Sequence, residues 1–167
     1  TASTFFLMDE GADTGDIVSQ KLIIIKNDNS TSLYGKIIKT AKPQIIQIIK
    51  NIIRGKIKIL KNKKIGNTWR KRSYVDGQID WRMSADSIIN LMKSLSFPYP
   101  GSHFIHKKKE YKLIDAKLIS LNKYINIEPG KILYIDKLNR PVIKCGKNAI
   151  KIYKINPMLK LKKDDYI

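Results

Sequence analysis

The segment GADTGD, residues 11–16, places two aspartates and two glycines between two apolar runs. A carboxylate with an ordinary pKa near ~3.9 is ionised at neutral pH and can accept or orient a proton during catalysis. Glycine lets a backbone bend tightly and approach a ligand closely. The segment therefore predicts a catalytic acid held in a tight loop. The alternative is a plain hairpin turn, in which both aspartates form Asx turns.

A second candidate is WRKR at residues 69–72, which combines an indole with guanidinium groups. Arginine can hold a phosphate through two hydrogen bonds and can stack on a base, so the segment predicts an anion clamp. The alternative is a basic loop anchored by one buried tryptophan. The residues themselves favour neither interpretation.

The whole chain is basic, since its 167 residues carry a formal net charge of +19. Such an excess attracts polyanions. The lysines, however, are spread from Lys21 to Lys163, and isoleucine is equally over-used. This pattern favours a general compositional bias and a solvated basic surface over a nucleic-acid site. The 43% hydrophobic content indicates a folded chain with a core rather than disorder.

Cys145 is the only cysteine, which excludes an intramolecular disulfide and a cysteine-rich zinc site. We expect this thiol in the core, in a reducing compartment, and we expect no metal site. No apolar run reaches the roughly 18 residues of a membrane span, and no signal peptide is visible, which predicts a cytoplasmic protein with no membrane partner. Thr1 stands directly before a strand pattern, so we expect the chain to be part of a longer one.

The elements that position the first loop follow from periodicity. Residues 3–8 and 17–25 predict neighbouring strands, the second buried on both faces. A helix with its N-cap at Ser30 or Thr31 should follow, kinked or divided at Pro43. Its apolar positions recur every three or four residues and are expected to face the core. They are Leu33, Ile37, Ile38, Ala41, Ile45, Ile48, Ile49 and Ile52.

The second half of the chain predicts one helix and several short strands. Ser84 is the expected N-cap of a helix through Leu95, which FPYPG at residues 97–101 ends. Trp81 is expected to pack in the core beside that helix. The final KKDDYI should fray. Strand-like runs occupy residues 111–119, 131–136, 141–145 and 149–155.

Three ordered motifs resemble the family of formyltransferases that use 10-formyltetrahydrofolate: FFLMDEGADTGDIVSQ, WRKR and DGQIDWRMSADSIINLMKSLSFPYPG. The match covers most of residues 1–101 and is far more specific than any one motif alone. It implies an α/β fold in which residues 1–101 form the C-terminal portion of a Rossmann-like catalytic domain. Residues 102–167 would then form a small β-rich, OB-like C-terminal domain.

The resemblance also implies a catalytic trio of Asn, His and Asp. Asp13 is the aspartate of this trio, whereas Asp16 falls where the family varies. The Asn and His lie on an upstream segment outside these residues, so the chain alone is expected to be inactive. His103 and His106 match no catalytic position and are expected at the surface. The residues expected to bind the cofactor, 10-formyltetrahydrofolate, are Asp9, Glu10, Gly11 and Ala12.

The implied reaction is the attack of an amine on a formyl carbon, in which Asp13 helps to take the surplus amine proton. The first acceptor is an amino sugar linked to a nucleotide, with Trp69, Arg70 and Arg72 contacting its base or phosphates. The second is charged initiator tRNA, as for methionyl-tRNA formyltransferase. It ranks second because residues 102–167 are shorter than the usual C-terminal extension of that enzyme, and its closing Gly-Lys-Lys pattern is not evident. A non-enzymatic basic module that binds RNA is the third reading, and a homodimer is a further expectation.

Overall fold

The computed structural model describes residues 1–62, 66–67, 69–123 and 125–167, which fall into two compact units. Unit 1 is Thr1–Arg70 and unit 2 is Lys71–Ile167. The division lies ahead of the boundary expected after Gly101, because the helix that follows Ser84 packs against the sheet of unit 2.

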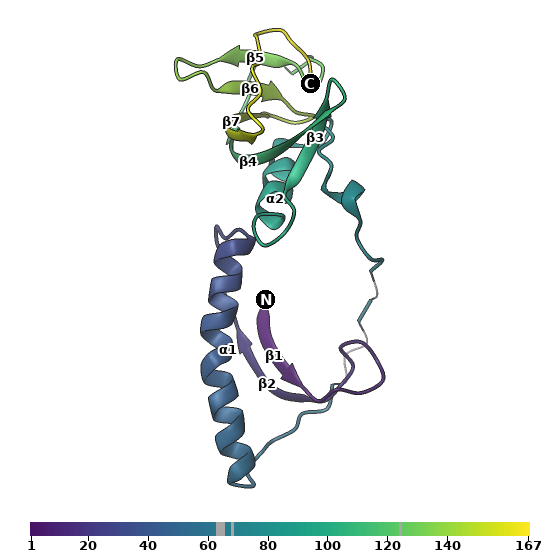
Figure 1. Ribbon diagram of the computed structural model, residues 1–167, viewed down its shortest axis with the longest axis vertical. Coiled ribbons are helices and arrows are strands. Elements are labelled where there is room, and N and C mark those ends of the chain that lie inside the picture. Colours follow the sequence, from purple (N-terminus) through teal and green to yellow (C-terminus); the bar gives the residue numbers. More distant parts are fainter. Residues whose placement is uncertain (63–65, 68, 124) are drawn as a thin grey trace. The chain divides into compact units, whose positions relative to one another are not determined.

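Unit 1 is a two-stranded antiparallel hairpin with one long helix beside it (Figure 1). The strands are β1 (Ala2–Phe6) and β2 (Ile17–Leu22), and Ala2 lies opposite Leu22. The helix is α1 (Ser30–Ile53). The prediction of two neighbouring strands followed by a helix is confirmed.

The N-cap of α1 is Asn29 rather than Ser30 or Thr31. The Asn29 side chain accepts a hydrogen bond from the Ser32 backbone N–H at 2.9 Å, and the Ser32 hydroxyl accepts one from the Asn29 N–H at 3.2 Å. This reciprocal pair satisfies two N–H groups that the helix itself cannot. Of the two outcomes expected at Pro43, a kink or a division, the division is wrong, because α1 runs through this residue. A proline removes one backbone donor, and the turns on both sides remain helical.

The expected burial of β2 and of the α1 apolar positions is wrong. Leu22 in β2 is 85% exposed. The side of the helix that covers the hairpin is centred on Gln44, whose buried amide donates hydrogen bonds to the Ser3 carbonyl at 3.2 Å and to the Ser19 hydroxyl at 3.0 Å. Half of the predicted core positions of α1 are half-buried, and the other half are exposed. The exposed ones are Ile38, Ile45, Ile49 and Ile52.

Unit 2 is a five-stranded antiparallel sheet against which one helix packs (Figure 1). The strand order is β3-β4-β7-β6-β5. The helix α2 (Ala85–Ser94) has Ser84 as its N-cap, as predicted. A short 3-10 helix, η1 (Tyr74–Gly77), precedes it. The strands are β3 (Ser102–His106), β4 (Lys109–Ile119), β5 (Ile132–Ile135), β6 (Pro141–Lys144) and β7 (Ala149–Asn156). All except β3 were predicted.

The core of unit 2 joins α2 to the sheet. Ile88 of α2 is fully buried together with Phe104 of β3. Trp81 is buried and packs edge-on against Phe104, with ring centroids 5.4 Å apart, which confirms its predicted core position. Cys145 is also buried as predicted, and burial raises the pKa of its thiol to about 12.

The C-terminal tail is hydrogen-bonded to the sheet edge, so the expected fraying is wrong. The Ile132 N–H donates to the Asp165 carbonyl at 2.8 Å, and the Asp164 N–H donates to the Ile132 carbonyl at 3.0 Å. The Ile167 N–H donates to the Gly130 carbonyl at 3.1 Å. These bonds cover part of the edge of β5, where backbone groups would otherwise lack partners.

Candidate active site

The loop between β1 and β2 carries the GADTGD segment and is closed at its base. The Leu7 N–H donates to the Asp16 carbonyl at 2.9 Å. Gly15 is buried at this neck, and a Cβ on it would lie 1.6 Å from the Leu7 carbonyl oxygen. Only glycine fits here, so the glycine predicted to permit a tight bend is a steric requirement of the loop.

Asp9 holds the loop from within. Its Oδ1 accepts hydrogen bonds from the Gly11 N–H at 3.2 Å and from the Thr14 hydroxyl at 2.5 Å. One carboxylate oxygen thus braces the turn that leads to Asp13. The neighbouring residues predicted to bind the cofactor, Glu10, Gly11 and Ala12, are exposed along this turn.

Asp13 stands at the exposed tip of the loop in a left-handed conformation, with φ of 60°. An aspartate tolerates this region better than most residues do, because its short side chain can bond locally. Its backbone carbonyl accepts a hydrogen bond from the Asn62 side chain at 3.1 Å. Among the residues that the structure describes, its carboxylate forms no hydrogen bond and no ion pair. The acid is therefore positioned through its backbone while its carboxylate stays available.

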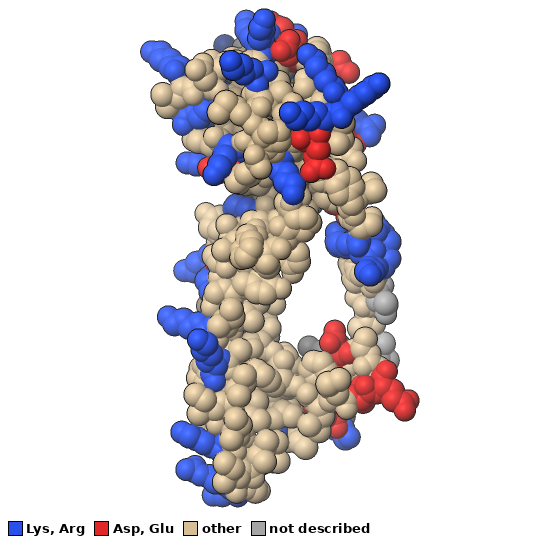
Figure 2. Space-filling model, viewed as in Figure 1, with Lys and Arg blue, Asp and Glu red and all other residues tan. Residues whose placement is uncertain are grey.

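Asp16 is the structural acid of the loop. Its carboxylate bonds the Lys61 ammonium at 2.7 Å and the Asn62 N–H at 3.2 Å. The hydrogen bond from Lys61 holds the pKa of Asp16 below its usual value. The two aspartates of DTGD thus have different surroundings, and within the described residues only Asp16 has its charge compensated by a lysine. Figure 2 shows acidic side chains gathered at this loop.

Lys61 and Asn62 are contacts that sequence reasoning missed. They reach the loop because Leu60 pairs with Ile17 through two backbone hydrogen bonds of 2.8 Å. The short segment Ile57 to Leu60, interrupted by Lys58, was a weak signal for an extended segment, but nothing in it identified Ile17 as its partner.

The residues of the predicted anion clamp lie in an extended stretch where the two units meet in sequence. Trp69 and Arg70 end unit 1, and Arg72 belongs to unit 2. Trp69 is 74% exposed, so the alternative of a basic loop anchored by a buried tryptophan is wrong. Thr68, just before the clamp, lies outside the described residues. The clamp stays a prediction.

His103 is buried, which corrects its expected surface position. It lies in β3, the strand that periodicity did not predict, and its ring stacks on Tyr74 with centroids 4.1 Å apart. The Tyr74 hydroxyl bonds Glu110 at 2.5 Å, and this hydrogen bond raises the pKa of Tyr74. His106 is half-buried. Both histidines belong to unit 2 and pack as parts of its sheet.

Unit 2 exposes a tyrosine flanked by cations on its sheet. The Lys117 ammonium lies 5.1 Å from the centre of the Tyr153 ring, and the Arg140 guanidinium lies 4.6 Å from it. Basic side chains spread over this unit in Figure 2. Both cations lie over the ring, and Arg140 also pairs with Asp136 at 2.9 Å, so the three side chains form a cation–π cluster on the sheet.

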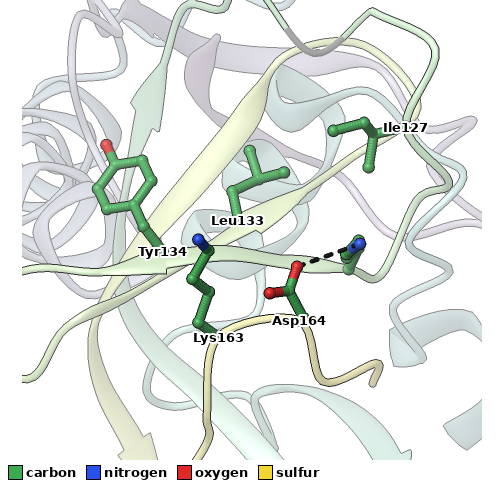
Figure 3. A pocket seen from close by; sticks show the side chains of 6 residues that line it. Ile127, Leu133, Tyr134, Lys163 and Asp164 are labelled. Atoms are coloured by element: carbon green, nitrogen blue, oxygen red, sulfur yellow. Dashed lines mark ion pairs between the residues drawn. The ribbon is translucent and has the colours of Figure 1, made fainter.

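A small pocket of about 410 Å³ lies at the edge of unit 2, between β5 and the tail (Figure 3). The ion pair between Lys131 and Asp164, 3.1 Å long, closes one side of it. The hydrogen bond that Lys131 donates to Asp164 raises the pKa of Lys131. Leu133 and Ile127 supply its apolar lining.

Two kinds of site are absent from the described part of the chain. No three His, Cys, Asp or Glu side chains gather there as a metal ion would require. None of its helices combines the length and the apolar character needed to cross a bilayer.

Comparison with known proteins points to one family. The family model described as formyl transferase, C-terminal domain, matches residues 71–163. The methionyl-tRNA formyltransferase of Caldanaerobacter subterraneus subsp. tengcongensis is 30% identical over 157 residues, which cover 93% of this chain and 49% of the relative. That of Caldicellulosiruptor saccharolyticus is 31% identical and is matched by 100% of this chain over 54% of its own length.

Solved structures agree with the fold. A structure of WlaRD, a sugar 3N-formyl transferase crystallised in the presence of dTDP and 5-N-formyl-THF, matches with a TM-score of 0.64 at 23% identity, covering 93% of this chain and 55% of that one. The chain spans about half the length of the curated relatives it matches.

Proposed function

The chain belongs to the formyl transferase family, whose C-terminal domain it carries in residues 71–163, and we propose that it takes part in formyl transfer from 10-formyltetrahydrofolate to methionyl-tRNA. The observation that carries this proposal is the division of roles in the β1–β2 loop. Asp16 is tied to Lys61, and Asp13 is held by its backbone with an exposed carboxylate.

The reaction requires a carboxylate that can accept a proton from the amine, and Asp13 carries an exposed carboxylate. When an amine attacks a formyl carbon, a C–N bond forms and the attacking nitrogen must lose a proton. The bond from that carbon to the folate nitrogen breaks, and the folate nitrogen gains a proton as it leaves. An ionised carboxylate at the reacting amine can orient and accept this proton. Asp13 takes that role, while Asp9 and Gly15 keep the loop in shape.

The folate would lie along the outside of the loop. Gly11 and Ala12 are exposed and carry no bulky side chains, which leaves room for a flat ring system beside the backbone. The cofactor supplies the formyl carbon. The loop residues hold it, with Glu10 and Asp9 on the same turn, and keep the acid at its edge.

Two observations favour methionyl-tRNA over a nucleotide-linked amino sugar as the acceptor. Both curated relatives reported above are named methionyl-tRNA formyltransferases and align with nearly the whole chain. Basic side chains spread over unit 2, and such a surface suits contact with the phosphates of an RNA strand. The amino sugar is the second candidate, supported by the likeness of fold to the sugar enzyme.

An acceptor comparison tests the proposal. The chain is joined behind the preceding half of the Caldanaerobacter methionyl-tRNA formyltransferase, and kcat/KM is measured with methionyl initiator tRNA and with a dTDP-linked amino sugar. We expect at least about a hundredfold preference for the tRNA, equivalent to about 2.7 kcal/mol. The opposite preference would make the amino sugar the acceptor. Transfer to neither would contradict formyl transfer itself.

A further inference from the structure

The pocket of about 410 Å³ in unit 2 brings charged, aromatic and aliphatic side chains together. It lies between β5 and the tail, and we call it the tail pocket (Figure 3). Its size falls in the range of small-molecule sites, which span roughly 300–1,000 Å³. It shares no residue with the candidate active site on the β1–β2 loop. The residues that line it are Ile127, Lys131, Leu133, Tyr134, Lys163 and Asp164.

The wall that the tail contributes is held in place by hydrogen bonds. The Asp164 N–H donates to the Ile132 carbonyl at 3.0 Å, and the Ile132 N–H donates to the Asp165 carbonyl at 2.8 Å. Within the tail, the Lys162 N–H donates to the Asp165 carboxylate at 3.0 Å. The ion pair between Lys131 and Asp164 ties the tail to the residue before β5. The tail pocket is therefore formed before a ligand binds, and a preformed site loses little conformational freedom on binding.

Lys163 supplies a positive charge that the tail pocket does not compensate. Figure 3 shows its side chain reaching from the tail toward Leu133 and Tyr134. Lys131 has its charge balanced by Asp164, whereas the Lys163 ammonium forms no ion pair and no hydrogen bond within the described residues. Two lysines and one aspartate leave one net positive charge in the lining. Because a lysine binds a phosphate as a point charge, an anionic group suits this position.

The rest of the lining suits a flat ring that carries an amino group. In Figure 3, Leu133 lies between Ile127 at one end of the pocket and Tyr134 at the other, which gives an aliphatic surface with an aromatic rim. Tyr134 is 37% exposed, so another ring can pack against it. One carboxylate oxygen of Asp164 pairs with Lys131. The other has no partner within the described residues and can accept a hydrogen bond from an amino group.

We propose that the tail pocket binds a phosphate monoester with an amino-substituted aromatic ring, of the size of a nucleoside monophosphate. The phosphate meets Lys163, the ring packs on Leu133 beside Tyr134, and its amino group donates to Asp164. A volume of about 410 Å³ admits a single nucleotide but no strand, so the occupant is a free mononucleotide rather than a segment of RNA. The proposal does not rest on the proposed function.

Titration of the whole chain with adenosine monophosphate (AMP) tests the proposal. In about 150 mM salt, which screens the basic surface, we expect one site with Kd of about 0.5 mM or below. Purine riboside monophosphate differs from AMP only in a hydrogen that replaces the amino group. It should bind at least about fivefold more weakly, because the hydrogen bond to Asp164 is lost. Ribose phosphate, which lacks the ring altogether, should bind at least about tenfold more weakly than AMP.

Two pairs of variants locate the site. Lys163→Gln should weaken AMP binding by at least about tenfold, whereas Lys162→Gln, at the neighbouring exposed lysine outside the lining, should change Kd by less than about twofold. Tyr134→Leu should weaken binding by at least about fivefold. Its control is Tyr153→Leu in β7, where the tyrosine has the same 37% exposure and AMP binding should stay unchanged. Circular dichroism checks that each variant keeps its fold.

Nuclear magnetic resonance locates the ligand without any substitution. AMP should shift the backbone amide signals of residues 131–134 and 163–164, and these shifts should saturate at the concentration that the titration gives. The signals of the β1–β2 loop in unit 1 should stay unchanged.

Saturable binding of AMP that shifts these signals and falls with Lys163→Gln and Tyr134→Leu would support the proposal. No binding at about 5 mM AMP would overturn it. Equal affinities for AMP and ribose phosphate would also overturn it, since they would indicate attraction to the basic surface alone. So would equal affinities for AMP and purine riboside monophosphate, or an RNA strand that needs Lys163 for binding while AMP does not bind.

Discussion

The two units of this chain differ in how they bury their apolar side chains. Of the hydrophobic residues that the structure describes as buried, Ile23 alone belongs to unit 1, and the others, from Ile79 to Ile152, belong to unit 2. Yet α1 is longer than α2 and is well capped. Unit 1 thus has regular secondary structure without a closed core, so a well-formed helix does not by itself produce a core.

Unit 2 has a closed core because its elements cover one another. The helix α2 packs on β4 and β7, and the tail bonds the edge of β5. Unit 1 carries the catalytic candidate instead. Its loop is well braced, but the layer that holds it has an open side.

The largest expected effect is in the folding of the separated units. We expect residues 71–167 alone to unfold cooperatively in urea, because their core is complete. Residues 1–70 alone should show no cooperative transition, because almost no apolar side chain is buried there. Circular dichroism against urea measures both. A cooperative transition in residues 1–70 alone would contradict the stated difference between the two units.

A smaller effect is expected from one pair of isoleucines. Ile88→Ala in α2 removes a fully buried side chain and should lower the free energy of unfolding of the chain by about 2 to 4 kcal/mol. Ile49→Ala in α1, where the side chain is 50% exposed, should change it by less than about 0.5 kcal/mol. Urea midpoints measure both variants, and equal losses would refute the difference between the units.

The smallest expected effect is on the stability of the folded chain at low pH, through Asp136 in unit 2. Burial alone would raise the pKa of Asp136, but hydrogen bonds from the Arg140 and Leu138 N–H groups and the Arg140 guanidinium lower it to about 2. The folded pKa lies below the unfolded value near ~3.9, so its contribution is present above about pH 4 and is lost as the pH falls toward 2. Asp136→Asn should flatten the fall in stability over that range. A profile of stability against pH that is the same for Asp136→Asn and for the original chain would contradict this prediction.

Local patterns in the sequence predicted most elements, since a 3.6-residue or two-residue period reports the local backbone. The predictions failed where partners far along the chain decide. His103 was expected at the surface because it matches no catalytic position of the family, and periodicity did not predict β3, which is only five residues long. The tail looked solvated by composition, although its backbone pairs with β5. The α1 positions were expected in the core because a period shows that a side is apolar but not what covers it.

The β1–β2 loop, like the fold, was predicted only in part from the sequence. The motif identified Asp13 and distinguished it from Asp16 through the resemblance to a family. The reason for the distinction, the bonds from Lys61 and Asn62 to Asp16, depends on a pairing between Ile17 and Leu60 that no local pattern indicates.

Formyl transfer by an Asp13 variant tests the central claim most directly. Asp13→Asn and Asp16→Asn are compared in the chain joined behind the preceding half of the Caldanaerobacter enzyme, with methionyl initiator tRNA as acceptor and folate binding measured alongside. Asp13→Asn keeps the shape of the side chain and should lower kcat by about a hundredfold or more while folate binding persists; Asp16→Asn should lower it much less. Near-normal turnover by Asp13→Asn would contradict the account and leave GADTGD as a turn.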